Sequence, residues 1–180
     1  MTAAENSLGE HEHVGPRGTS QGQPWWAGEG LRFACLGCGR CCRGESGGVF
    51  MLPDEEQRIA AALGLSVDEL RKRFETSRWR FPSLRERSGG ECVMHGSDGR
   101  CGIYAVRPLM CRTWPFWPEL LESPHAWAEA ARHCPGMNEG PLWTPEQIAA
   151  VLSEHEEYAR ALNEAWNKEG EPWSRAFGNC

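Results

Sequence analysis

The pattern of apolar and polar residues predicts an amphipathic helix near the end of the chain more clearly than any other element. Thr144 suits an N-cap, Pro145 suits the first helical position, and Gln147 completes a capping box. Apolar side chains then recur at helical spacing over about five turns. We expect this helix to pack along the domain through one stripe, formed by Ile148, Val151, Leu152, His155, Tyr158, Ala159, Leu162 and Trp166.

Two shorter helices are predicted in the first half of the chain. Pro53 suits the start of the first helix, and Gly64 suits its end. Ser66 followed by Glu69 forms a capping box, which predicts a second helix from Val67 to about Glu75. Both helices have apolar residues on one side, so we expect each of them to cover part of a core.

The middle of the chain predicts short extended segments and turns. Residues 78–87 alternate well enough for an extended segment, which Pro82 restricts to an edge. Residues 91–94 and 101–104 flank a turn rich in Gly and Asp, so we expect a small hairpin with Cys92 and Cys101 near its tip. The remaining predictions are a helical turn in 107–112, an irregular aromatic lid over 113–118 and a helix over 127–133.

These elements predict an α+β fold: a small cysteine-rich domain with a few helices, a short hairpin, long loops and a C-terminal amphipathic helix. Residues 1–30 lack hydrophobic periodicity and are predicted to be a mobile tail, although Trp25 and Trp26 are apolar enough to fold back. The domain is predicted over residues 31–167, with a second tail over 168–180.

Cysteines indicate the chemistry of this domain. The chain has nine, and four of them lie within eight residues of one another, at Cys35, Cys38, Cys41 and Cys42. Thiolates this close repel one another unless a cation or a cluster neutralises them. A further four follow in loops that contain Gly, Pro or His, namely Cys92, Cys101, Cys111 and Cys134. We predict these eight as ligands of one or two metal centres and Cys180 as a bystander.

Two kinds of centre agree with this spacing. Cys35, Cys38 and Cys41 reproduce the first three ligands of the bacterial ferredoxin run, which favours iron–sulfur clusters of the [4Fe–4S] type. Zinc is the alternative, since structural zinc sites tolerate many spacings. A disulfide framework is disfavoured because adjacent Cys41 and Cys42 cannot easily bond to each other, and because the first residues do not have the pattern of a secretory signal, so that we expect a reducing compartment.

Charged neighbours of the cysteines have two interpretations. Arginines abut several thiols and either stabilise an anionic centre or form ordinary surface ion pairs, at Arg40, Arg43, Arg107 and Arg112. Histidines could replace a thiolate, although a lone histidine is usually solvated, at His95, His125 and His133. The basic run from Arg71 to Arg87 is expected to be a solvated face, with an acidic protein partner as the alternative.

Composition excludes several function classes. The formal net charge of −6 argues against nucleic-acid binding by bulk electrostatics. The sequence has no apolar run long enough for a membrane helix, and it has no P-loop, dinucleotide fingerprint, nucleophile elbow or HExxH motif. We therefore expect a cytoplasmic protein without a membrane or nucleic-acid partner.

Three ordered motifs resemble the YkgJ-like cysteine-cluster family, also described as the CxxCxxCC zinc- or iron-chelating domain. The first motif is Phe33-x-Cys35-x2-Cys38-Gly39-x-Cys41-Cys42. The second is Cys101-x-Ile103-Tyr104-x2-Arg107-Pro108-x2-Cys111-Arg112-x2-Pro115, and the third is Cys134-Pro135-Gly136. The resemblance covers about residues 33–160. It implies a small bacterial domain that binds an iron–sulfur cluster or zinc. A related cysteine cluster occurs in flagellin lysine methylases, but this chain has no evident methyl-donor site. Trp114 stands where the family often has phenylalanine.

Three functional hypotheses follow. The first is an iron–sulfur protein that acts with a protein partner in electron transfer or in support of a modification reaction. The second is a structural zinc module that holds a binding surface made by the aromatic segment 113–118. The third is an enzyme that uses an open coordination position of the metal, so whether the chain is catalytic is left open.

Overall fold

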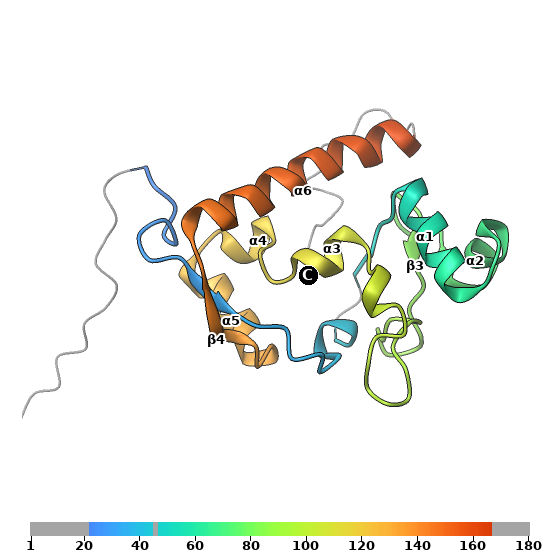
Figure 1. The fold of residues 1–180 in the computed structure, drawn as a ribbon, viewed down its shortest axis with the longest axis horizontal. Coiled ribbons are helices and arrows are strands. Elements are labelled where there is room, and N and C mark those ends of the chain that lie inside the picture. The colour runs from blue at the N-terminus through green and yellow to red at the C-terminus, as the bar shows by residue number, and fades with distance from the viewer. Residues whose placement is uncertain (1–21, 45–46, 167–180) are drawn as a thin grey trace, which may run out of the picture.

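The computed structural model describes residues 22–44 and 47–166, and Figure 1 shows how their elements are arranged. The fold is mixed α+β, as predicted, with helices and short antiparallel strands. Its elements are β1 (Leu31–Phe33), η1 (Arg40–Cys42), α1 (Pro53–Leu63), α2 (Val67–Phe74), β2 (Glu75–Thr76), β3 (Ser83–Leu84), η2 (Tyr104–Val106), α3 (Leu109–Thr113), α4 (Pro118–Leu121), α5 (Pro124–His133), β4 (Met137–Trp143) and α6 (Pro145–Trp166). No helix among the described residues is both long and apolar enough to cross a membrane.

Helix α6 packs along the domain, as its apolar stripe predicted. In Figure 1 it runs along one side of the molecule, past α4 and α3 toward α1. Ile148 belongs to a core cluster with α4, α5 and the β1–β4 sheet, whereas Tyr158 and Leu162 belong to a second cluster that contains Phe50. One helix therefore joins the two ends of the domain.

The two predicted helices of the first half are confirmed. Helix α1 begins at Pro53 and ends before Gly64, which adopts a left-handed φ of 68°. In α2 the Ser66 hydroxyl accepts a hydrogen bond from the Glu69 amide at 3.2 Å, which completes the predicted capping box. The helix ends at Phe74 because the next residues form β2, which pairs with β3. Only residues 83–84 of the predicted extended segment 78–87 lie in a strand.

The sheet of β1 and β4 was not predicted. Its strands are antiparallel, with Leu31 opposite Trp143 and Phe33 opposite Met137, and a bulge lies between Arg32 and Phe33. The β4 sequence contains Gly and Pro and lacks regular alternation, so sequence periodicity could not identify it. The pairing matters for the candidate site because it anchors the chain directly before Cys35.

Part of the predicted N-terminal tail packs on the domain. Trp26 is 7% exposed in the first core cluster, and the Trp25 indole donates a hydrogen bond to the Leu121 carbonyl at 2.8 Å. Residues 1–21 and 167–180, with Cys180, lie outside the described residues. The domain limits at residues 31 and 167 therefore stay a prediction.

The aromatic segment 113–118 is core rather than a lid. Phe116 is 1% exposed and packs against Phe33 and Trp143, with ring centroids 5.9 Å and 4.6 Å away. The segment connects α3, which confirms the predicted helical turn, to α4, which the sequence did not indicate. Its large apolar area is buried here because the β1–β4 sheet and α5 cover it. Helix α5 starts at Pro124, earlier than predicted, because Ser123 caps it.

Candidate metal centre

The loop that carries the four clustered cysteines leaves the β1–β4 sheet and ends in a short 3-10 helix. The Ala34 amide donates to the Gly136 carbonyl at 3.0 Å, and Gly39 caps η1 with a φ of 65°. A Cβ atom on Gly39 would lie 2.4 Å from the Gly99 carbonyl oxygen and 2.5 Å from His95 Nε2. Glycine is therefore required at this position, because the loop touches the turn between His95 and Cys101 there.

The predicted hairpin around that turn is reduced to an isolated bridge. His95 pairs with Cys101, and Cys92 pairs with Glu86 in a second isolated bridge. Residues 104–106 form η2 instead of continuing a strand. The segment between β3 and α3 thus contains little regular structure, although it carries two of the predicted ligands.

Five of the eight predicted cysteines converge on one region. The Cys42 thiol hydrogen-bonds with the sulfurs of both Cys41 and Cys101. The Cys92 amide donates to the Cys42 carbonyl at 2.8 Å. Cys92 and Cys111 lie close enough to Cys41 and Cys101 for their charges to interact. The loop, the turn and α3 therefore bring together thiols that are far apart in the sequence.

The pKa values of these thiols diverge because they share protons. Hydrogen bonding from Cys42 lowers the pKa of Cys41 to about 7 and that of Cys101 to about 6, and the Arg107 charge adds to both effects. The pKa of Cys42 is raised, since its proton is held between two sulfurs. Burial raises the pKa of Cys92 and of Cys111. A bound metal would replace the shared protons, because thiolates are its ligands.

The other three predicted cysteines are placed differently. Cys35 is exposed and hydrogen-bonds with the Tyr104 hydroxyl, and the guanidinium carbon of Arg107 lies 3.8 Å from the centre of that ring. Cys38 is exposed. Cys134 is partly buried and accepts a hydrogen bond from the Trp114 indole at 3.5 Å.

Backbone pairing links two of these three cysteines. Ala34, which precedes Cys35, pairs with Gly136, which closely follows Cys134. A Cβ on Gly136 would clash with the Ala34 carbonyl oxygen, so the two backbone segments are in contact here. The Cys35 and Cys134 segments therefore lie side by side at one end of the β1–β4 sheet.

The donor set fits a soft metal, but the thiols are not arranged around one point. Among the described residues, no group of three His, Cys, Asp or Glu side chains is placed so that it could hold a metal ion. Cys35, Cys38 and Cys41 are exposed on a glycine-containing loop. Clustered sulfur donors, with Arg107 beside them, match the chemistry of zinc or iron–sulfur ligation.

His95 is a candidate site residue that sequence reasoning did not favour. Its ring is buried, with Nδ1 2.6 Å from Glu91 Oε1, and Nε2 has no hydrogen-bond partner. Hydrogen bonds from Arg87 and then from His95 lower the pKa of the Glu91 carboxyl. By contrast, His125 and His133 are exposed on α5. The signal in the sequence was the position of His95 between Cys92 and Cys101.

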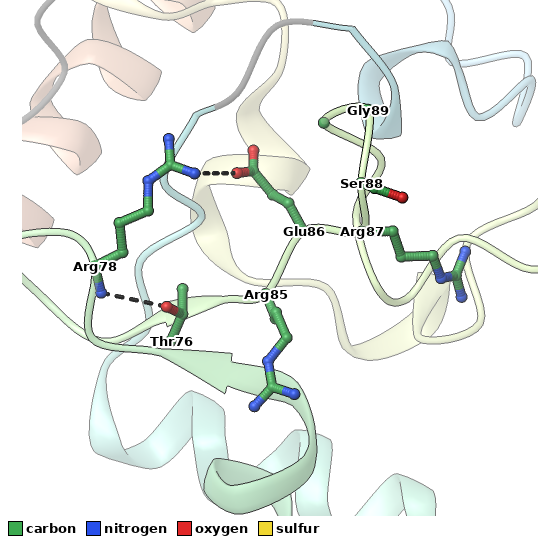
Figure 2. A pocket seen from close by; sticks show the side chains of 8 residues that line it. Thr76, Arg78, Arg85, Glu86, Arg87, Ser88 and Gly89 are labelled. Atoms are coloured by element: carbon green, nitrogen blue, oxygen red, sulfur yellow. Dashed lines mark hydrogen bonds and ion pairs between the residues drawn. The ribbon is translucent and has the colours of Figure 1, made fainter.

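The basic run contributes a pocket that is separate from the thiols. A pocket of about 460 Å³ lies among the residues shown in Figure 2, which include Arg78, Arg85, Glu86 and Arg87. Arg78 faces Glu86 at 3.6 Å, Arg85 donates to the Glu75 carbonyl at 3.0 Å, and Arg87 donates to the His95 carbonyl at 2.8 Å. These guanidinium groups make contacts within the fold, and no cysteine lines the pocket.

Comparison with known proteins agrees with this donor set. The family model described as "CxxCxxCC: Putative zinc- or iron-chelating domain" matches residues 34–135, which contain every cysteine of the candidate site. The chain is also 30% identical over 88 residues to an uncharacterized protein of Methanocaldococcus jannaschii. That match covers 48% of this chain and 46% of the relative, so the chain spans less than half of the relative's length. No solved structure matches the chain.

Proposed function

The chain belongs to the CxxCxxCC family of zinc- or iron-chelating domains, and we propose that its cysteines ligate an iron–sulfur cluster of the [4Fe–4S] type. The observation that carries the proposal is the convergence of Cys41, Cys42, Cys92, Cys101 and Cys111 from the loop, the turn and α3. Thiols are the ligands that such clusters use.

The spacing of the cysteines favours a cluster over a single zinc ion. Cys35, Cys38 and Cys41 match three ligands of a bacterial ferredoxin cluster. The number of converging thiols does not separate the two centres, because a [4Fe–4S] cluster and a tetrahedral zinc ion each take four thiolates. A second centre would draw on Cys134, whose segment adjoins that of Cys35 at the β1–β4 sheet.

We propose electron transfer, or support of a modification reaction on a protein partner, as the role of the centre. A bound cluster would supply one-electron chemistry. The exposed positions of Cys35, Cys38 and Cys41 would place it near the surface, within reach of a partner. The guanidinium of Arg107 would offset the negative charge of thiolates, as it does for Cys41 and Cys101. A bacterial, cytoplasmic protein without a nucleic-acid partner is part of this proposal.

Structural zinc is the second candidate, and one observation favours it. The segment between β3 and α3 has only isolated bridges and η2, so a metal would supply much of its order. Residues 113–118 do not form the binding surface of such a zinc module, because Phe116 is buried in the core. A zinc centre would instead hold the turn that carries Cys92 and Cys101.

Metal and sulfide analysis of protein purified without oxygen tests the proposal. We expect a brown protein with about four iron and four acid-labile sulfide per cluster. Colourless protein with about one zinc ion per chain, after anaerobic cluster assembly with iron and sulfide, would overturn the cluster and establish the zinc candidate. The apoprotein treated with zinc alone is the matched control, since it separates uptake of zinc from loss of a cluster during preparation.

A further inference from the structure

His95 carries a buried nitrogen that the fold leaves without a partner. The residue is 4% exposed, and Nε2 accepts or donates no hydrogen bond among the described residues. An unsatisfied buried polar atom is costly, so each such atom in a native fold calls for an explanation. Here the explanation must lie in what Nε2 faces.

The other ring nitrogen fixes the tautomer. Nδ1 lies 2.6 Å from Glu91 Oε1, and Arg87 donates to Glu91 Oε2 at 2.9 Å. An ionised carboxylate can only accept hydrogen bonds, so the proton is on Nδ1. In the neutral ring Nε2 then presents a lone pair, which is the form of histidine that binds metals.

The position of His95 brings its ring next to Cys101. His95 and Cys101 are partners in an antiparallel bridge, and the flanking hydrogen bonds join Gly96 to Arg100 and Gly102 to Met94. The pair is thus of the non-hydrogen-bonded type, in which the two side chains share a face and lie close together.

Gly39 places the cysteine loop on the same side of the ring. A Cβ atom on Gly39 would be 2.5 Å from Nε2, so the backbone between Cys38 and Cys41 lies directly against that nitrogen. The backbone bridge between His95 and Cys101 places this thiol next to the ring. Nε2 therefore lies between the turn and the loop that supply the sulfur ligands.

We propose that His95 Nε2 is a ligand of the metal centre, next to Cys101, with Glu91 as the positioning residue. The inference rests on the proposed function, since it assumes a centre at these cysteines. A carboxylate on the far nitrogen is the usual arrangement behind a metal-binding histidine, because it fixes the ring and raises its basicity. The centre then has a mixed sulfur and nitrogen donor set, and one of the eight cysteines is free for another role.

A neutral nitrogen donor would change the properties of the centre. Replacing a thiolate by imidazole removes one negative charge from the ligand set, and in two-iron clusters such replacement raises the reduction potential. The same change would suit a zinc ion, for which three cysteines and one histidine are a common set. The proposal therefore makes a prediction for either metal.

The test uses the full chain with 15N-labelled histidine. In the iron form, reduced after anaerobic assembly, pulsed electron paramagnetic resonance is expected to detect one strongly coupled 15N nucleus. The coupling should vanish in His95→Gln and persist in the matched control His133→Gln, whose histidine is exposed on α5. If the chain takes zinc instead, the 15N resonance of one Nε2 should move on addition of Zn2+ in wild type and in His133→Gln alone.

A second variant guards against misfolding of His95→Gln. Glu91→Gln keeps the histidine and removes the carboxylate charge behind it, so the 15N coupling should persist while metal affinity falls about 10–100-fold. Iron-loaded wild-type protein without any histidine coupling would overturn this inference and leave the proposed cluster standing, and zinc-loaded protein without any histidine shift would overturn this inference as well. A chain that takes up neither metal would overturn both.

Discussion

The Trp114 indole donates a hydrogen bond to the Cys134 sulfur at 3.5 Å. This contact places Cys134 beside the core cluster of Phe33, Phe116 and Trp127. Cys92 and Cys101 pack instead against the cluster that contains Met51 and Ile59. The eight cysteines are therefore not equivalent, although their spacing alone did not assign them to particular centres.

Serine substitutions should reveal this difference. We expect Cys101→Ser to abolish most metal binding, because Cys101 shares a proton with Cys42 at the centre of the converging thiols. Cys134→Ser should keep the metal that the converging thiols hold and lose only what a second centre contributes. Metal content of the two variants, purified together without oxygen, checks the prediction. Equal losses would show that Cys134 and Cys101 serve the same centre.

Local sequence signals predicted the helices of this fold well. Capping residues and periodicity lie within a few positions of one another, as at Ser66 and Glu69, so they can be recognised without knowledge of the rest of the chain. The β1–β4 sheet escaped because its pairing joins Leu31 to Trp143 across most of the domain. Its strands are stabilised by tertiary contacts, and their propensity is weak.

In the candidate site, too, local features could be predicted from the sequence and long-range contacts could not. The spacing of Cys35 to Cys42 identified the donor type, since that information is local. The proximity of Cys42 to Cys101 depends on how the loop and the turn meet at Gly39, which no spacing rule describes. His95 was disfavoured for a related reason: a lone histidine becomes informative only when its burial and its Glu91 contact are known.

Removal of the Tyr158 hydroxyl should destabilise the domain. It lies within hydrogen-bonding distance of the Glu55 carboxylate and of the Phe50 carbonyl, all of them buried. Tyr158→Phe leaves the carboxylate with fewer donors, so we expect the free energy of unfolding to fall by about 1–3 kcal/mol. Urea denaturation of metal-free protein measures it, because the hydroxyl of the control residue Tyr104 contacts the predicted ligand Cys35. Tyr104→Phe, at an exposed ring, is the control, and a similar loss there would mean that the buried network is not the cause.

Glu75 should make stability fall as the pH rises. The residue is 8% exposed, and burial, followed by the charge of Glu56, raises its pKa to about 7. The unfolded chain has the ordinary value of about 4.3. Between these values the folded state binds more protons than the unfolded state, so stability decreases with increasing pH. The contribution of the Glu75 carboxyl to the free energy of unfolding is complete below about pH 4. It is lost once the pH exceeds the pKa of Glu75 in the folded protein.

A neutral glutamine tests this dependence. Relative to wild type, Glu75→Gln should gain about 1–3 kcal/mol in free energy of unfolding at pH 8 and little near pH 4, since the wild-type carboxyl is already neutral there. Thermal or urea unfolding across this range gives the difference between the two proteins, in which the titration of the cysteines cancels. A constant difference at all pH values would refute the assignment to Glu75.

Two glycines of the cysteine loop offer a matched pair for the contact with His95. Gly37 and Gly39 have nearly the same positive φ, 63° and 65°, so alanine strains the backbone similarly at both. Only at Gly39 would the new Cβ meet other atoms, namely the Gly99 carbonyl oxygen and His95 Nε2, whereas nothing lies within 4 Å at Gly37.

We therefore expect Gly39→Ala to push the loop away from the turn and to weaken metal binding by at least about 10-fold, while Gly37→Ala shows only the smaller cost of backbone strain. Competition with a metal chelator measures both affinities under the same conditions. The difference between the variants isolates the steric contact, because the strain is common to both. If Gly37→Ala weakened binding as much as Gly39→Ala, loop conformation alone would govern the centre and the contact between Gly39 and His95 would have no part in it.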